Sequence, residues 1–158
     1  MIEPLTIDAE EKAKLRRSFE FGAYVAITQY LARTYGLSEL QKFAEFWAGL
    51  AADQRKHLMS KSHREFIEAE AKVEKVWVDR EAKRMDDKGY VGVVDACPLR
   101  RATNTNRGDL PLDYFCDSIC AVIYPEGYKA LGLKSAITKF EKGCKVEIDL
   151  EQPSPADG

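Results

Sequence analysis

The spacing of apolar residues changes about half-way along the chain, and this change limits the fold more than any other feature. From Leu15 to Leu31 apolar residues recur at helical spacing. After residue 89 the segment 90–94 is rich in β-branched residues, and residues 135–140 and 144–150 alternate. Helices that come before the strands predict an α+β fold, with N-terminal helices packed on a C-terminal antiparallel sheet and one further helix.

Capping signals predict where the helices of the first half begin. Asp8 with Glu11, and Ser38 with Gln41, match the capping box, and a third helix is expected to start near Ser62. Gly36 stands where a helix commonly ends. The first helix is expected to turn one face to the core, formed by Leu15, Phe19, Gly22, Ala23, Ala26, Ile27, Tyr30 and Leu31.

Turn residues divide the second half. Residues 86–89 form a strong turn signal, so the chain is predicted to change from helix to strand between Val76 and Met85. A polar loop is expected from Arg100 to Gly108, followed by a helix from about Asp113 that Pro125 breaks. Residues 135–140 and 144–150 are expected to form a hairpin.

The overall composition excludes several classes of function. The 158 residues fit one domain, predicted over residues 1–150, and the polar tail 151–158 is predicted to be disordered. With 24 basic and 26 acidic residues, the chain has no basic excess for nucleic acid. No apolar run approaches the roughly 18 residues of a membrane span. The N-terminus lacks a signal-peptide core, so we expect a cytoplasmic protein.

All four cysteines lie in the second half, at Cys97, Cys116, Cys120 and Cys144. Disulfides are rare in the cytoplasm, so clustered thiols there more often bind metal or react. Cys116 and Cys120, four residues apart, would share one face of a helix. The other two are expected at strand ends, from which they could meet the pair.

Three interpretations of the cysteines remain open from the sequence. They could pack in the core as small apolar side chains. They could hold zinc or a 4Fe–4S cluster, with Cys97, Cys116, Cys120 and Cys144 as ligands. Finally, a thiolate of Cys97 or Cys116 could act directly as a nucleophile or redox group.

Other residues are candidates for ligand binding beside the cysteines. Arg100 and Arg101 follow Cys97 closely and could stabilise a thiolate or bind a carboxylate, although a solvated loop would explain them as well. Tyr124 is one of several aromatic residues around the cysteine helix, and these could line a pocket or belong to the core. Asp117 adjoins Cys116 and could serve as an acid or base.

Short motifs in the second half resemble a known family. Cys97-Pro98 after a strand, the segment 116–120 and the segment 143–148 are similar to the L-2-amino-thiazoline-4-carboxylic acid hydrolase-like family. This resemblance implies hydrolysis of a carbon–nitrogen bond in a small cyclic amidine or thiazoline, with matching positions at Cys97, Cys116, Asp117 and Cys144. The Gly143-Cys144 hairpin also resembles small-molecule sensor domains related to the 4-vinyl reductase family, which carry a cysteine-rich metal site.

The sequence therefore predicts a hydrolase of non-peptide carbon–nitrogen bonds, with Cys97, Cys116 and Asp117 as catalytic residues and Arg100, Arg101 and Tyr124 binding the substrate. The alternative is a domain without catalysis, in which the cysteines hold zinc or an iron–sulfur cluster for binding or sensing. The expected partner is a small molecule, and neither nucleic acid nor a membrane is expected. A homo-oligomer is left open, since the long N-terminal helices could also form an interface.

Overall fold

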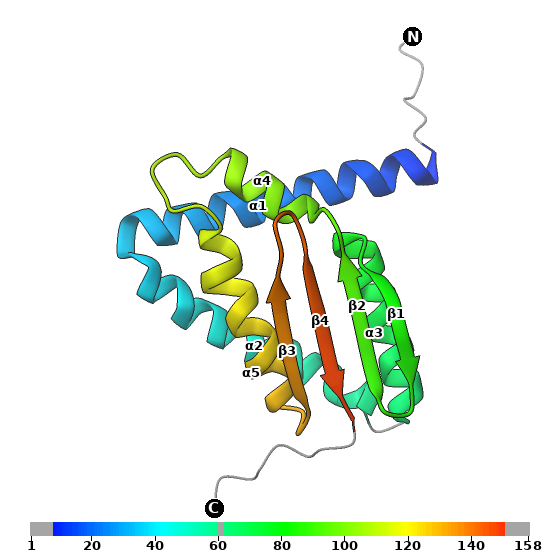
Figure 1. Ribbon diagram of the computed structural model, residues 1–158. Coiled ribbons are helices and arrows are strands. Elements are labelled where there is room, and N and C mark those ends of the chain that lie inside the picture. The colour runs from blue at the N-terminus through cyan, green and yellow to red at the C-terminus, as the bar shows by residue number, and fades with distance from the viewer. Residues whose placement is uncertain (1–7, 60–61, 151–158) are drawn as a thin grey trace, which may run out of the picture.

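The computed structural model describes residues 8–59 and 62–150. Its sheet lies in one layer and most of its helices lie behind it (Figure 1). The predicted α+β fold is confirmed. Along the described residues the elements are α1 (Ala9–Tyr35), α2 (Leu37–Met59), α3 (His63–Val78), β1 (Glu81–Asp86), β2 (Gly89–Val94), α4 (Pro98–Thr105), a π-helix (Cys116–Cys120), α5 (Ala121–Lys129), β3 (Lys134–Lys139) and β4 (Cys144–Asp149).

Three of the four predicted capping signals are confirmed. The Asp8 side chain accepts a hydrogen bond from the Glu11 backbone N–H at 2.8 Å, and Ser62 accepts one from Glu65 at 3.1 Å. Gly36 ends α1 with φ of 90°, a conformation that suits glycine. The fourth signal, at Ser38, was wrong, because α2 begins at Leu37 and the Gly36 carbonyl accepts its first helical bond.

The predicted apolar face of α1 is largely exposed. Leu15 is 54% and Phe19 is 79% accessible, whereas the buried residues of this helix are Phe21, Val25, Thr28 and Ala32. The N-terminal part of α1 projects past the rest of the molecule (Figure 1). Helix periodicity is compatible with more than one face here, and contact with α2 and α4 selects the face that is buried.

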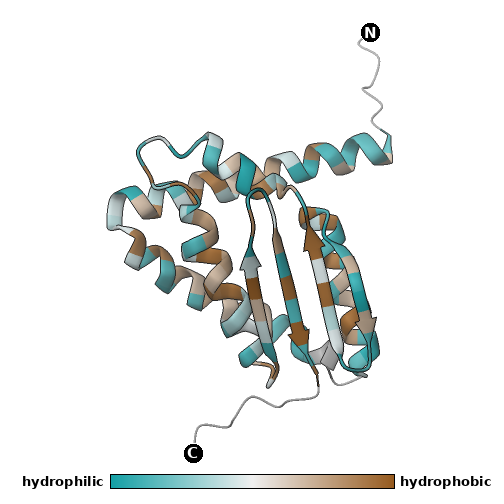
Figure 2. Ribbon diagram, in the orientation of Figure 1, coloured by the Kyte–Doolittle hydropathy of each residue, from teal (hydrophilic) through white to brown (hydrophobic). Residues whose placement is uncertain are grey.

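The sheet is antiparallel, and its four strands within the described residues are ordered β1-β2-β4-β3. The predicted hairpin of β3 and β4 and the strand at 90–94 are both confirmed. Cys144, Val146 and Ile148 of β4 are buried in alternation with half-buried residues, and Figure 2 shows the corresponding bands of hydropathy. Helices α3 and α5 contact the sheet, so the buried row of β4 faces the helical layer.

Two local predictions were wrong. Residues 98–105 form α4 rather than a loop: Pro98 stands at the helix start, where a missing N–H costs nothing, and Leu99 and Thr103 are buried on one face. Helix α5 continues through Pro125, because Tyr124 and Tyr128 on either side of it are buried. Burial of a helix face outweighs an unfavourable local preference.

Two further expectations concern membranes and the C-terminal tail. Across residues 8–59 and 62–150, no helix is both long and apolar enough to cross a membrane. The tail 151–158, which was predicted to be disordered, lies outside the described residues.

Candidate functional site

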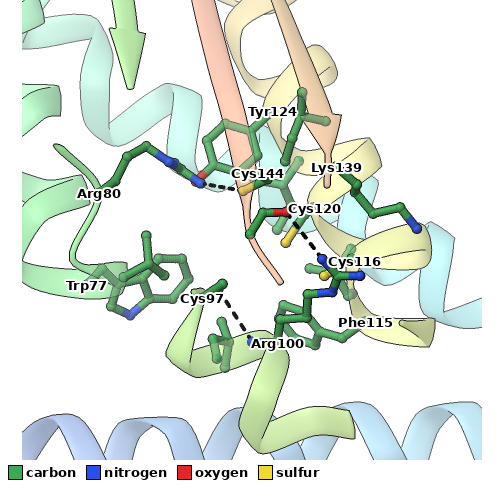
Figure 3. Close-up of a pocket in the computed structure, with 16 residues that line it drawn as sticks. Trp77, Arg80, Cys97, Arg100, Phe115, Cys116, Cys120, Tyr124, Lys139 and Cys144 are labelled. Atoms are coloured by element: carbon green, nitrogen blue, oxygen red, sulfur yellow. Dashed lines mark hydrogen bonds between the residues drawn. The ribbon is translucent and has the colours of Figure 1, made fainter. Parts of the chain in front are cut away.

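A small apolar pocket lies where α3, α4, α5 and the β3–β4 hairpin meet, and all four cysteines line it (Figure 3). Its cavity is about 40 Å³. The sulfur atoms, distant along the chain, therefore surround one cavity. Its other lining residues are Trp77, Val78, Arg80, Leu99, Arg100, Phe115, Ile119, Ile123, Tyr124, Ile137, Lys139 and Gly143.

Each cysteine reaches the pocket from the end of an element. Cys97 precedes α4 as its N-cap, and Cys144 is the first residue of β4. Cys116 and Cys120 are the two ends of the π-helix, in which the Ala121 N–H bonds to the Cys116 carbonyl. A π-turn inserted in a helix is rare and frequently lies at a functional site.

Gly143 allows the chain before Cys144 to pack closely against the segment that leads to Cys97. A Cβ atom at this position would overlap the Val94 carbonyl oxygen, so only glycine fits against the end of β2. Val94 pairs with Cys144, and the Cys97 backbone N–H bonds to the Lys142 carbonyl at 3.0 Å. The turn thus holds Cys97 beside Cys144.

Cys144 belongs to a buried charged network. The Arg80 guanidinium donates a hydrogen bond to the Cys144 sulfur at 3.1 Å and another to the Tyr124 hydroxyl at 2.7 Å. Arg80 also forms an ion pair with Glu74, and both residues are almost inaccessible, at 2% and 3%. The Tyr124 hydroxyl donates to Glu74 at 2.8 Å.

Burial dominates the titration of this network. It raises the pKa of the Glu74 carboxyl, against the opposing charge of Arg80. Burial also raises the pKa of the Cys144 thiol, although the Arg80 charge and hydrogen bond oppose it. Cys144 is therefore a neutral thiol near neutral pH. Arg80 mainly holds Glu74 and Tyr124 in place rather than activating Cys144.

Cys116 and Cys120 have a different environment on the other side of the pocket. A hydrogen bond from Cys120 lowers the pKa of Cys116, burial opposes this shift, and the positive charges of Arg100 and Lys139 support it. The same hydrogen bond, together with burial, raises the pKa of Cys120 well above its usual value. The pair therefore consists of one acidic thiol and one thiol that keeps its proton. Burial also raises the pKa of Cys97.

Arg100 is fixed in place by Asp113 and by the turn between β3 and β4. Its guanidinium donates to the Asp113 carboxylate at 2.7 Å and to the carbonyl oxygens of Phe140 at 2.6 Å and Gly143 at 3.2 Å. The hydrogen bond from Arg100 lowers the pKa of Asp113. Asp113 has φ of 61°, and Asn104 holds it in this uncommon conformation by accepting its backbone N–H at 2.9 Å.

The structure brings some of the predicted site residues together and separates others. Arg100 and Tyr124 line the pocket with the cysteines. Arg101 and Asp117 are exposed and do not line it, although Asp117 forms an ion pair with Lys139, which does.

Sequence reasoning missed Arg80, Glu74 and Lys139. Arg80 lies in a strongly charged stretch, so nothing in its neighbourhood distinguished it from solvated residues. A signal for Glu74 did exist: it follows Phe66 by two steps of four residues, which places it on the same helix face, and both are buried.

The predicted metal site was wrong. Among the described residues no group of three or more histidine, cysteine, aspartate or glutamate side chains could hold a metal ion. The Cys97 sulfur accepts the Arg100 backbone N–H at 3.4 Å, and the Cys144 sulfur accepts the Arg80 guanidinium. Hydrogen bonds thus direct these two sulfurs to separate donors.

Comparison with known proteins found one informative likeness. No family model matches the chain, and no curated protein matches its sequence. Among solved structures, a trafficking protein particle complex subunit 3 from Naegleria fowleri, covalently bound to palmitic acid, has a TM-score of 0.54. It is 14% identical, and the match covers 89% of this chain and 98% of that chain. At this identity the likeness shows a shared fold.

These findings overturn the family resemblance inferred from the sequence. The chain shares its fold with a protein of a different kind, a trafficking-complex subunit, and no family model supports an L-2-amino-thiazoline-4-carboxylic acid hydrolase. The short cysteine motifs were too unspecific to identify a family. The predicted hydrolase activity was wrong, and so was the alternative of a metal-binding or sensor domain, which was inferred from the four cysteines and from the 4-vinyl reductase resemblance.

Proposed function

We propose that this domain binds an acyl chain in the cysteine-lined pocket and carries it as a thioester on Cys116. The observation that carries the proposal is that four thiols line one apolar cavity. Among these four thiols Cys116 alone has a lowered pKa. The solved structure with this fold is described as covalently bound to palmitic acid. The choice of Cys116 rests on this chain alone.

The chemistry required is an exchange between a thiol and a thioester. The Cys116 thiolate attacks the carbonyl carbon of an acyl thioester such as an acyl-coenzyme A. A new carbon–sulfur bond forms, the carbon–sulfur bond of the donor breaks, and the donor thiolate leaves and takes a proton. Arg100 and Lys139 favour the attacking thiolate by their positive charge.

The pocket must widen to accept a long acyl chain. A cavity of about 40 Å³ is only a few times the roughly 10–15 Å³ that one water needs. Apolar side chains such as Ile119, Ile123 and Ile137 fill the space around it. We expect these side chains to separate around the chain and to contact its methylene groups, which would stabilise the adduct by burying apolar surface.

The proposal places the domain in the cytoplasm, as the sequence predicted. All four cysteines are free, and acceptor thiols persist in a reducing compartment.

A homo-oligomer stays a prediction: Phe19, Ile27 and Tyr30 leave apolar surface exposed along α1. Sedimentation of the protein at several concentrations would test it, with Phe19→Ser expected to shift the population toward monomer and an unchanged distribution arguing against this surface.

Acylation can be tested directly by mass spectrometry. The reduced protein is incubated with palmitoyl-coenzyme A or with a short-chain acyl-coenzyme A, and adducts are mapped before and after hydroxylamine, which cleaves thioesters. We expect one palmitoyl group on Cys116, a slower reaction with the short chain, and loss of the adduct in Cys116→Ser. Cys97→Ser is the matched control, which should keep the adduct.

Three outcomes would overturn the proposal. The wild-type protein could remain unmodified. The palmitoyl group could be spread equally over all cysteines. Finally, urea-unfolded protein could react as fast as folded protein, which would show that the pocket contributes nothing.

A further inference from the structure

We propose that Cys116 and Cys120 are a redox modification site, at which a hydroperoxide converts the two thiols into a reversible intramolecular disulfide. The inference goes beyond acyl binding, because the reaction needs no acyl group and no donor. It concerns the two cysteines that stand at the ends of one π-helix and that both line the pocket.

Geometry selects this pair from the four cysteines. Cys116 and Cys120 are four residues apart on one turn, so their side chains project to the same side of the π-helix. The other two sulfurs are engaged elsewhere, Cys97 by the Arg100 backbone N–H and Cys144 by the Arg80 guanidinium. Figure 3 shows Cys116 beside Cys120, with Arg100 and Lys139 on the same side of the pocket.

The two thiols differ in the way that the reaction requires. Hydrogen bonding from Cys120 favours the thiolate of Cys116, which is the nucleophile toward a peroxide. Cys120 retains its proton until Cys116 has reacted, so it suits the role of the resolving thiol. A resolving thiol on the same short helix as the attacking sulfur, and on the same side of it, needs little movement to close the bond.

The reaction proceeds in two balanced steps. In the first, the Cys116 thiolate attacks one peroxide oxygen, the oxygen–oxygen bond breaks, and the leaving hydroxide or alkoxide takes a proton; Cys116 becomes a sulfenic acid. In the second, the Cys120 sulfur attacks the Cys116 sulfur, the sulfur–oxygen bond breaks, and water leaves as the Cys120 proton is released. Overall, two thiols are oxidised and one hydroperoxide is reduced.

The size of the pocket suits this oxidant. A cavity of about 40 Å³ has space for a molecule the size of hydrogen peroxide without any movement of its walls. A long acyl chain, in contrast, requires the walls to separate. The pocket as it stands therefore has room for the oxidant but not for a long acyl chain, and the oxidised pair would leave no free Cys116 for acylation.

The experiment treats the reduced full-length protein with hydrogen peroxide, alkylates the remaining thiols and maps the products by mass spectrometry. We expect a disulfide between Cys116 and Cys120 that dithiothreitol reverses. In Cys120→Ser we expect a sulfenic acid on Cys116 that dimedone traps, and in Cys116→Ser no disulfide. The matched controls Cys97→Ser and Cys144→Ser should still form it, and circular dichroism verifies that each variant folds.

Several results would overturn the inference. These are a disulfide that joins a different pair, dimedone labelling of Cys97 or Cys144 in place of Cys116, or equal oxidation of the folded protein and of protein unfolded in urea. Failure here is separable from failure of the proposed function, because the reduced protein is tested for acylation without peroxide. Pre-oxidised protein that still accepts a palmitoyl group on Cys116 would show that the pair had not formed.

Discussion

The two sides of the pocket place the same residue type in opposite electrostatic settings. Cys144 contacts a guanidinium at 3.1 Å and yet has a raised pKa, because burial outweighs the charge of Arg80, which Glu74 already neutralises. Cys116 has a lowered pKa, and the largest cause is a hydrogen bond from a neighbouring thiol rather than a cation. At Cys144 burial outweighs both the charge and the hydrogen bond of Arg80, whereas at Cys116 the influences that favour the thiolate outweigh burial, so neither a nearby cation nor a donor by itself predicts the direction of a thiol pKa shift.

This contrast also separates two roles. The Arg80–Glu74–Tyr124 network is buried, so we expect it to contribute to the stability of the fold. The Cys116–Cys120 side adjoins Lys139, which is partly exposed, so it is the side from which a reagent can enter. The following variants test this division, beginning with the largest expected effect.

Arg80→Met should destabilise the protein most. It leaves the Glu74 carboxylate buried without its ion-pair partner, and breaking a buried pair in this way costs about 3–5 kcal/mol. Urea unfolding measures the loss. Arg84→Met, an exposed arginine on β1, is the control and should change the free energy of unfolding by less than about 1 kcal/mol. An Arg80→Met protein as stable as the wild type would contradict a structural role for this network.

Ile119→Ala should cost somewhat less, roughly 2–5 kcal/mol, because it removes a buried side chain and enlarges the cavity. The same variant should speed palmitoylation of Cys116, since less material must move to admit the chain. Leu112→Ala, at an exposed position, is the control for stability. A slower palmitoylation in folded Ile119→Ala would argue against a chain seated in this pocket.

The pH dependence of alkylation should distinguish the two thiols. Only the thiolate reacts, so iodoacetamide should modify Cys116 at a lower pH than an ordinary thiol, and Cys144 only at a higher pH. Cys120→Ala removes the donor and should move the Cys116 profile to higher pH, whereas Cys97→Ala should leave it nearly unchanged. If Cys116 and Cys144 were alkylated with the same pH dependence, the proposed difference between their pKa values would be wrong.

The same shifts determine the sign of the effect on stability. The lowered pKa of Cys116 contributes stability above its unfolded pKa, and this contribution is lost as the pH falls through the folded value. The raised pKa of Cys144 acts in the opposite sense: its contribution is present below the unfolded pKa and is lost as the pH rises through the folded value. Comparing urea unfolding of Cys116→Ala and Cys144→Ala across alkaline pH would separate the two signs.

Lys139→Met should have the smallest effect. Its ion pair with Asp117 is partly exposed, so its loss should cost less than about 1 kcal/mol. The alkylation of Cys116 should slow moderately, and salt should affect its rate less than in the wild type. Lys129→Met, on the exposed surface of α5, is the control. An unchanged rate and an unchanged salt response would show that Lys139 does not act on Cys116.

Much of the secondary structure could be predicted from local patterns. The alternation in β4 and the turn before it indicated the hairpin, and Ser62 indicated the start of α3. The error at α4 was avoidable, because Pro98 directly after Cys97 is typical of a helix start. The error at Pro125 was harder to avoid, since that helix is maintained by the burial of Tyr124 and Tyr128, which a local pattern does not reveal.

The site was predictable only in part. The sequence indicated that Cys116 and Cys120 share a helix face, because that relation depends only on a spacing of four residues. Cys97 and Cys144 meet through strand pairing between Val94 and Cys144 and through a glycine that fits against β2, and both depend on segments far apart along the chain. The burial of Arg80 depends in the same way on Glu74 and Tyr124.

The sequence by itself thus determined the order of helices and strands and the pairing of two thiols on one turn, because these features depend on interactions between neighbours along the chain. Only the tertiary structure decided which face of α1 is buried, which cysteines surround the pocket and which thiol is acidic. The physical reason is that burial and hydrogen bonding shift a pKa, and both are set by side chains that packing brings together from distant segments.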